Sequence, residues 1–244
     1  MKSSDKYGMY EDLVSTAVVF HKRLNPKLWR KGKLKPEIRF RLLKIARNFV
    51  EFIGLDRLNM TDITISGSNA AYTYSRASDI DLHLIVKIPE DRKELMRQLF
   101  DAKKNQYNFT YDIKVNGIDV ELYVQDEEQV HTSAGIYSVL DDRWLKTPQA
   151  VQDNLDRSLV SQKYKHFKGK IRVALKSSDL KAVRNVYDDI RKMRQHGLSQ
   201  SGELGVENIT FKILRAKGLI EKLRNHISKL EAGGLSLEMN NENI

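Results

Sequence analysis

The sequence predicts an α/β (α+β) fold, in which a small mixed sheet follows N-terminal helices and precedes a helical C-terminal domain. Three changes of hydrophobic period support this expectation. Apolar residues recur at helical spacing near the N-terminus, alternate with polar residues between about 61 and 125, and then return to helical spacing. We therefore expect a first domain over residues 1–130, including a helical segment over 1–58, and a second domain over 131–244.

The clearest N-terminal element is an amphipathic helix over residues 36–53. Its apolar residues recur at steps of three and four, with a proline at the start and a glycine just beyond the end. These residues are Ile38, Leu42, Ile45, Phe49 and Phe52, between Pro36 and Gly54. An apolar stretch around Val14, Ala17, Val18 and Leu24 indicates an earlier helix. A basic connector joins it to the helix over residues 36–53.

Four segments in the middle of the chain alternate polar and apolar residues, as half-buried strands do. They are DITIS, DIDLHLIV, FTYDIKV and GIDVELYV. Asn116-Gly117 separates the last two, and this dipeptide favours a tight hairpin turn. Residues 91–104 return to helical spacing, so the middle of the chain is expected to mix sheet and helix.

The strand signals fade after about residue 131, and two strong helical patterns follow. One runs from Leu180 to Met193 and the other from Ile209 to Ile227. The polar tail EMNNENI is expected to be disordered.

The composition restricts the kinds of partner and metal site that we expect. The chain has no cysteine, and its six histidines are scattered, so a metal would be held mainly by oxygen atoms. The formal charge of +10 favours an anionic partner such as nucleic acid or a nucleotide. No apolar run approaches about 20 residues and the first residues lack a secretory pattern, so we expect a cytoplasmic protein without a membrane partner.

Two carboxylates share one face of the expected strand in SDIDLHLIV. Alternation sends Asp79, Asp81 and His83 to the face opposite the apolar residues. Like charges this close repel each other, and a divalent cation between them removes that penalty. Because the evident ligands are hard oxygens, Mg²⁺ or Mn²⁺ is the expected ion. His83 either touches a phosphate or metal ligand, or lies beside the site or in solvent.

A third acid stands on the later strand GIDVELYV, where Asp119 and Glu121 share one face. Such an acid reaches the metal if the two strands are neighbours. Glu121 is preferred because apolar residues flank it on both sides, and Asp119 is kept as the alternative. The plainer interpretation of Glu121 is an outward charge on an edge strand.

A glycine-serine turn precedes the first acidic strand. The run Ser66-Gly67-Ser68-Asn69 directly follows the apolar residues ITI. A glycine here lets the backbone approach a phosphate closely, and amides at the start of a following helix can donate to it.

This order of features resembles the nucleotidyltransferase superfamily with the polymerase beta-like fold. The family pattern is Gly-Ser, a gap, Asp-apolar-Asp, and later a lone Asp or Glu between apolar residues. Here the gap is residues 69–78, and the match extends over residues 61–125. Flanking phrases such as KLWRKGKLKPEIRF and MRQHGLSQSGELG are similar to bacteriophage proteins that carry this core, which implies a phage origin and the host cytoplasm.

The resemblance implies a metal-dependent nucleotidyltransferase that transfers an NMP from an NTP and releases pyrophosphate, with two Mg²⁺ or Mn²⁺ ions at the site. The residues expected to contact the nucleotide are Gly67, Ser68, Asn69 and Ser78. The carboxylates expected to ligate the metal ions and serve catalysis are Asp79, Asp81 and Glu121. The third acid would help to activate the attacking hydroxyl.

The identity of the acceptor is left open. The basic charge favours an RNA or DNA 3′ end, while a protein hydroxyl or a small molecule is an alternative. Residues 27–35 and 162–172 combine basic with aromatic side chains, which suits contact with nucleic acid, although such charges also serve as solvated helix faces. Competing functions on the same fold are a nucleotide- or RNA-binding module without turnover and a phage protein that acts on the host.

Overall fold

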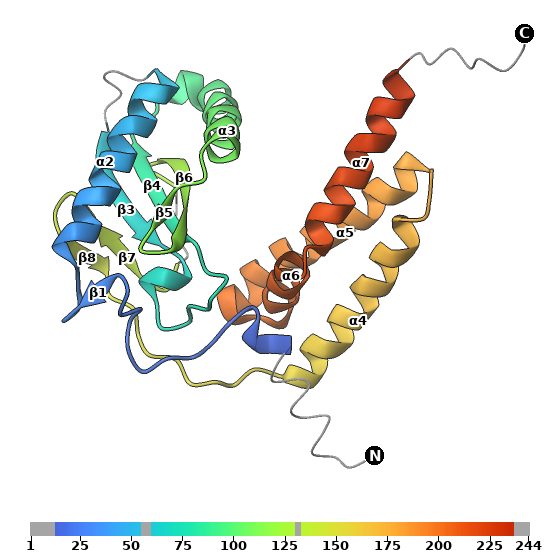
Figure 1. Cartoon of the computed structure of the whole chain (residues 1–244), viewed down its shortest axis with the longest axis horizontal. Coiled ribbons are helices and arrows are strands. Elements are labelled where there is room, and N and C mark those ends of the chain that lie inside the picture. Colours follow the sequence, from blue (N-terminus) through green and yellow to red (C-terminus); the bar gives the residue numbers. More distant parts are fainter. Residues whose placement is uncertain (1–12, 55–59, 130–132, 237–244) are drawn as a thin grey trace, which may run out of the picture. The chain divides into compact units, whose positions relative to one another are not determined.

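The computed structural model describes residues 13–54, 60–129 and 133–236. Contacts divide the chain into two compact units, one formed by Val18–Asp153 and the other by the residues on either side of it. The first unit combines a mixed sheet with helices, and the second consists of helices (Figure 1). The α/β fold class that the sequence predicts is confirmed.

Within the described residues, six strands form one sheet in the order β5-β6-β4-β3-β7-β8. Their bounds are β3 Met60–Ser66, β4 Ile80–Val86, β5 Lys114–Val115, β6 Ile118–Asp126, β7 Ile136–Ser138 and β8 Arg143–Lys146. β4 and β6 run parallel, and the other neighbouring pairs are antiparallel. A parallel pair needs a crossover connection, which η2 (Glu90–Arg92) and α3 (Lys93–Thr110) supply.

α2 (Pro36–Ile53) begins and ends where the sequence predicts. Pro36 lies in the first turn, and Gly54 ends the helix with a φ of +72°. The buried stripe packs in one core with the apolar face of the sheet and consists of Ile38, Leu42, Ala46, Phe49 and Ile53. Ile45 and Phe52, predicted to belong to this stripe, are only partly buried because the buried face is centred on Ala46.

The chain before α2 is less helical than the sequence predicts. In the described part, helix is limited to residues 13–15, and the basic connector forms a hairpin of β1 (Trp29–Arg30) and β2 (Lys33–Leu34). Lys31 and Gly32 between these strands both have positive φ, as a tight hairpin turn requires. The expected earlier helix is therefore wrong beyond residue 15, because the apolar spacing there reflects burial in irregular chain.

Two further differences concern the edges of the sheet. Phe109 and Thr110, predicted to begin a strand, still belong to α3, which leaves β5 only two residues before the Asn116-Gly117 turn. β7 and β8 lie beyond residue 131, where the sequence shows no strand pattern. All three residues of β7 are buried, so no alternation of polar and apolar residues marks this strand.

From Asn154 onward, the described part of the second unit is built from four longer helices and a short one. These are α4 (Arg157–Ala174), α5 (Leu180–Ser201), η3 (Gly202–Leu204), α6 (Val206–Ala216) and α7 (Leu219–Leu235). The pattern predicted as one run from Ile209 to Ile227 is broken at Gly218, whose φ is +68°. The predicted disordered tail lies outside the described residues. None of the helices described is both long and apolar enough to cross a membrane.

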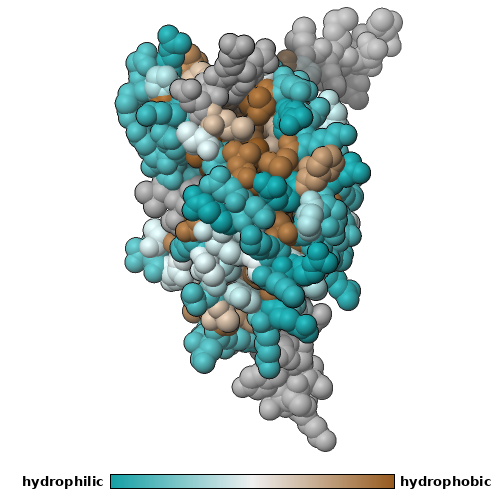
Figure 2. All heavy atoms as spheres, turned by 90° about the vertical axis from the view of Figure 1, so that its left-hand side faces the viewer, coloured by the Kyte–Doolittle hydropathy of each residue, from teal (hydrophilic) through white to brown (hydrophobic). Residues whose placement is uncertain are grey.

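Hydrophilic side chains cover most of the face drawn in Figure 2, with a smaller group of apolar side chains among them. In the sheet unit, Phe40 on α2 and Phe109 on α3 are 65% and 94% exposed. These two rings lie on the surface of the unit and do not pack in its hydrophobic core.

Candidate active site

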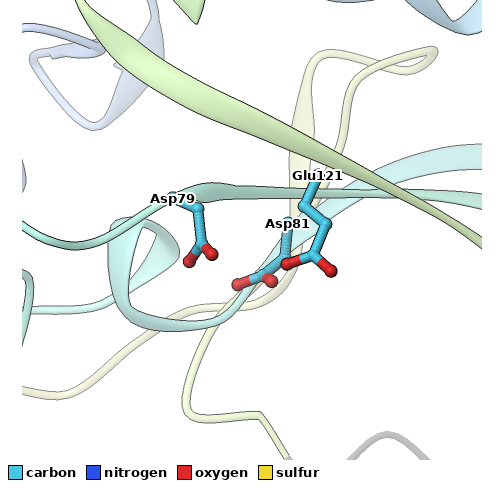
Figure 3. Close-up of side chains that lie close together, drawn as sticks. All are labelled: Asp79, Asp81 and Glu121. Atoms are coloured by element: carbon cyan, nitrogen blue, oxygen red, sulfur yellow. The ribbon is translucent and has the colours of Figure 1, made fainter. Parts of the chain in front are cut away.

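Three carboxylates converge near the start of β4 (Figure 3). Asp79 immediately precedes β4, Asp81 lies in it, and Glu121 lies in β6. The parallel pairing places Asp81 and Glu121 side by side as partners in register. One oxygen from each of the three side chains lies within 4.8 Å of the others, and all three side chains are partly exposed. Ions and substrates in solvent can therefore reach this cluster.

The structure separates the two candidates for the third acid. Asp119 is exposed and forms an ion pair with Lys114, its partner in register on β5. Asp119 and Glu121 share a face, as alternation predicts, but the carboxylate of Asp119 is engaged by Lys114. Among the described residues, the group close enough to share a metal contains Glu121 and not Asp119.

Gly67 contributes to the acid site through its missing side chain. Its φ of +72° and ψ of −160° belong to a region that is almost restricted to glycine. A Cβ added at this position would lie 2.0 Å from Oδ2 of Asp81. Sequence reasoning assigned this glycine to the approach of a phosphate, and the structure shows that it also makes room for the Asp81 carboxylate.

The two serines predicted to contact a nucleotide lie next to each other. Ser68 begins η1 (Ser68–Ala70), and its hydroxyl donates to Oγ of Ser78 at 2.8 Å. The same Oγ accepts a hydrogen bond from the amide of Ser75 at 2.9 Å. Ser78 directly precedes Asp79 in the chain, so this pair of hydroxyls is anchored next to the start of β4.

Asn69 is fully buried, and its side chain is bonded to other parts of the protein. Its Nδ2 donates to the carbonyl oxygens of Asp79 at 2.7 Å and Ser78 at 3.3 Å. Its Oδ1 accepts from Nδ2 of Asn25 at 2.8 Å, and its backbone carbonyl accepts from the indole of Trp29 at 2.7 Å. The structure therefore places Asn69 where it fixes the backbone of Asp79.

Replacing Asn69 with alanine is expected to lower the free energy of unfolding by about 2–3 kcal/mol, because buried polar groups lose their hydrogen-bond partners. Urea denaturation followed by circular dichroism measures this change. Asn105→Ala is the matched control, since Asn105 is exposed on α3, and it should stay within about 0.5 kcal/mol of the wild type. Equal stability of the two variants would contradict the positioning role of Asn69.

Tyr123 lies beside the acids, although sequence reasoning did not single it out. Its hydroxyl donates to Glu121, and burial followed by the charges of the nearby carboxylates raises its pKa. The hydroxyl therefore stays protonated at neutral pH and orients Glu121. The Tyr123 ring stacks on that of His83, with centroids 4.9 Å apart, and Nε2 of His83 lies 3.1 Å from Oγ of Ser66. The sequence did contain a signal for Tyr123, because alternation along the strand puts it on the same face as Glu121.

The donor set at this site suits a hard divalent cation. All three groups are carboxylates, which Mg²⁺ and Mn²⁺ prefer to softer ligands. Oxygens bound to one Mg²⁺ at about 2.1 Å lie at most about 4.2 Å apart, so small side-chain rotations bring the three acids to a common ion. Asp79, Asp81 and Glu121 therefore fit such an ion in charge, chemistry and spacing.

In comparisons with known proteins, no family model and no curated protein matches the chain. Among solved structures, the chain shows a likeness to the STING-associated CdnE c-di-GMP synthase from Capnocytophaga granulosa. The two are 14% identical, the match covers 93% of this chain and 89% of that chain, and the TM-score is 0.24. At this TM-score the likeness carries no argument about function, so the site is interpreted from its own geometry.

Proposed function

We propose that the protein is a Mg²⁺- or Mn²⁺-dependent nucleotidyltransferase, which transfers an NMP from an NTP to a hydroxyl acceptor and releases pyrophosphate. The observation that supports it most strongly is the convergence of Asp79, Asp81 and Glu121 from neighbouring strands beside the Gly67-Ser68 turn. The order and spacing of these residues along the chain support the same assignment. Because its flanking segments resemble bacteriophage proteins, we also propose that the protein acts in the cytoplasm of a bacteriophage host.

Each group at the site has a distinct part in this proposal. Asp79, Asp81 and Glu121 would hold the divalent ions. When bound, such ions neutralise the charge of the triphosphate and of the transition state. The hydroxyl of Ser78, which accepts from Ser68 and from the amide of Ser75, keeps its own proton and would donate it to a phosphate oxygen, and Asn69 keeps Asp79 in position.

The transfer is an in-line displacement at the α-phosphorus. The acceptor oxygen forms a new bond to phosphorus, while the bond from phosphorus to the oxygen that bridges to the β-phosphate breaks. Pyrophosphate leaves with that electron pair, and the acceptor proton passes to Glu121 or to water. Tyr123 contributes by orienting the Glu121 carboxylate through a hydrogen bond.

Incubation of the full chain with α-labelled NTPs, Mg²⁺ or Mn²⁺, and a panel of acceptors tests the function. The panel contains an RNA 3′ end, a DNA 3′ end, a protein and small hydroxyl compounds. We expect label on one acceptor class and release of pyrophosphate, neither of which occurs with Asp79→Asn. NTP or RNA binding that persists without divalent metal, with no pyrophosphate from any acceptor, would instead indicate a binding module without turnover.

A further inference from the structure

Two pockets lie in the unit Val18–Asp153, and the nearer one reaches the residue before Asp79. The near pocket has a volume of about 550 Å³, and its lining includes Arg76 and Ser78, the residue that directly precedes Asp79. The far pocket has a volume of about 680 Å³. His21 and Tyr74 line both pockets, so the two pockets are neighbours that share one wall.

The shared wall is built from a stacked pair of rings. The rings of His21 and Tyr74 lie 3.7 Å apart between centroids and are 7° from parallel. The His21 amide donates to the carbonyl of Tyr72 at 2.8 Å, and Nε2 of His21 donates to the carbonyl of Tyr74 at 2.9 Å. These bonds fix the wall before a ligand arrives, which lowers the entropic cost of binding.

The charged side chains that line the two pockets are all positive. Five exposed cations line them, and none of the described lining residues is acidic. The cations are Lys22, Arg23 and Lys31 in the far pocket and Lys27 and Arg76 in the near pocket. In the part of the chain that the structure describes, no ion pair engages any of the five. Their field is therefore available to a ligand that carries several negative charges.

The pockets present rings and cations rather than groups that read base edges. Tyr72, Tyr74 and His21 are half-buried, so parts of their rings reach solvent. The amide of Asn25, which lines the near pocket, is already used, because it donates to Asn69 and accepts from the amide of Lys27. Aromatic faces combined with phosphate-binding cations bind single strands with little sequence preference.

We propose that the near and far pockets bind single-stranded nucleic acid, whose 3′ hydroxyl is the acceptor at the carboxylate site. The cations contact successive phosphates, Tyr74 stacks on a base, and the near pocket directs the strand end toward Asp79. The acceptor role rests on the proposed function, whereas binding of the strand can be measured independently of it.

The first test compares two double variants that each remove one exposed lysine and one exposed arginine. K22Q/R23Q changes the far pocket, and K222Q/R224Q changes α7 by the same amount of charge. Fluorescence anisotropy with a labelled single-stranded oligonucleotide, without NTP and with a metal chelator, measures affinity over a range of salt. We expect K22Q/R23Q to weaken binding at least about tenfold and to reduce the slope of log K against log salt by about 1.4, since each single-strand phosphate contact contributes about 0.7.

The second test concerns the ring of Tyr74. Tyr74→Leu should weaken oligonucleotide binding about tenfold through loss of stacking. Tyr74→Phe keeps the ring and should bind as the wild type does. A loss in both variants, or in neither, contradicts a stacking contribution.

The outcomes separate this proposal from the proposed function. If K22Q/R23Q and K222Q/R224Q bind the oligonucleotide equally well, the pocket proposal is wrong, even where NMP transfer to some acceptor is observed. If K22Q/R23Q weakens binding of Mn²⁺-NTP and leaves oligonucleotide binding unchanged, the pockets serve the donor and the proposal also fails. If K22Q/R23Q loses the oligonucleotide while the wild type transfers no NMP, strand binding by the pockets stands and the enzymatic function is refuted.

Discussion

Asp81→Asn is expected to lower the rate of NMP transfer by at least about a thousandfold, because it removes a proposed metal ligand, and such a ligand contributes several kcal/mol of charge stabilisation. The change keeps the size of the side chain and leaves β4 in the sheet, so the fold should persist. A transfer assay with α-labelled NTP under saturating Mg²⁺ measures the effect. Asp81 is chosen because it pairs in register with Glu121 and its Oδ2 occupies the space beside Gly67.

Asp119→Asn is the matched control for this prediction. It makes the same chemical change near Glu121 on the same strand, but Asp119 is exposed and pairs with Lys114. We expect transfer at nearly the wild-type rate. A second measurement excludes misfolding: Mn²⁺ should raise the Tm of the wild type and of Asp119→Asn, and should not raise that of Asp81→Asn. Full activity of Asp81→Asn would remove the basis of the proposed function.

Gly67→Ala is expected to reduce transfer by about a hundredfold, the size of effect that a displacement of about 1 Å at a reacting group produces. The added Cβ would lie 2.0 Å from Oδ2 of Asp81, so the carboxylate has to leave its position. The backbone conformation adds a loss of stability of about 1–3 kcal/mol. Steady-state transfer rates and urea denaturation measure the two effects separately.

Gly202→Ala distinguishes the collision at Asp81 from backbone strain. Gly202 has nearly the same backbone angles as Gly67, with a φ of +67° and a ψ of −159°, and beyond its chain neighbours no atom lies within 4 Å of its added Cβ. We expect Gly202→Ala to lose stability to a similar extent and to keep its activity. A comparable loss of activity in both variants would show that strain alone accounts for the effect at Gly67.

Long periodic segments of the fold were predictable from the sequence, and short strands that depend on partners were not. α2 was predicted over its whole length because an amphipathic stripe, a proline and a glycine agree locally. β7 has three residues and is held by pairing with β3 and β8, so its formation depends on distant parts of the chain. The hairpin of β1 and β2 was missed because each strand has two residues, which are too few to show a period in the sequence.

The same distinction applies to the candidate site. Alternation within single strands predicted which face Asp81 and Glu121 occupy, and the structure brings those side chains together. The contacts of Asn69 with Asn25 and Trp29 join residues far apart in sequence, and no local pattern indicates them. The preference for Glu121 over Asp119 agrees with a register between strands that only the folded sheet reveals.

The parallel pairing of β4 with β6 determines which parts of the chain can change length during evolution. The crossover between the two acid-bearing strands packs on the sheet through Phe100 and Tyr107, but its turn at Glu90 and Asp91 is exposed, so insertions in that turn lengthen a link and leave the cluster unchanged. One residue inserted between Ile118 and Glu121 would move every following side chain of β6 to the opposite face of the sheet. The Glu121 carboxylate would then point into the hydrophobic core. Related chains should therefore vary in the size of the crossover while keeping the interval from the Asn116-Gly117 turn to this acid constant.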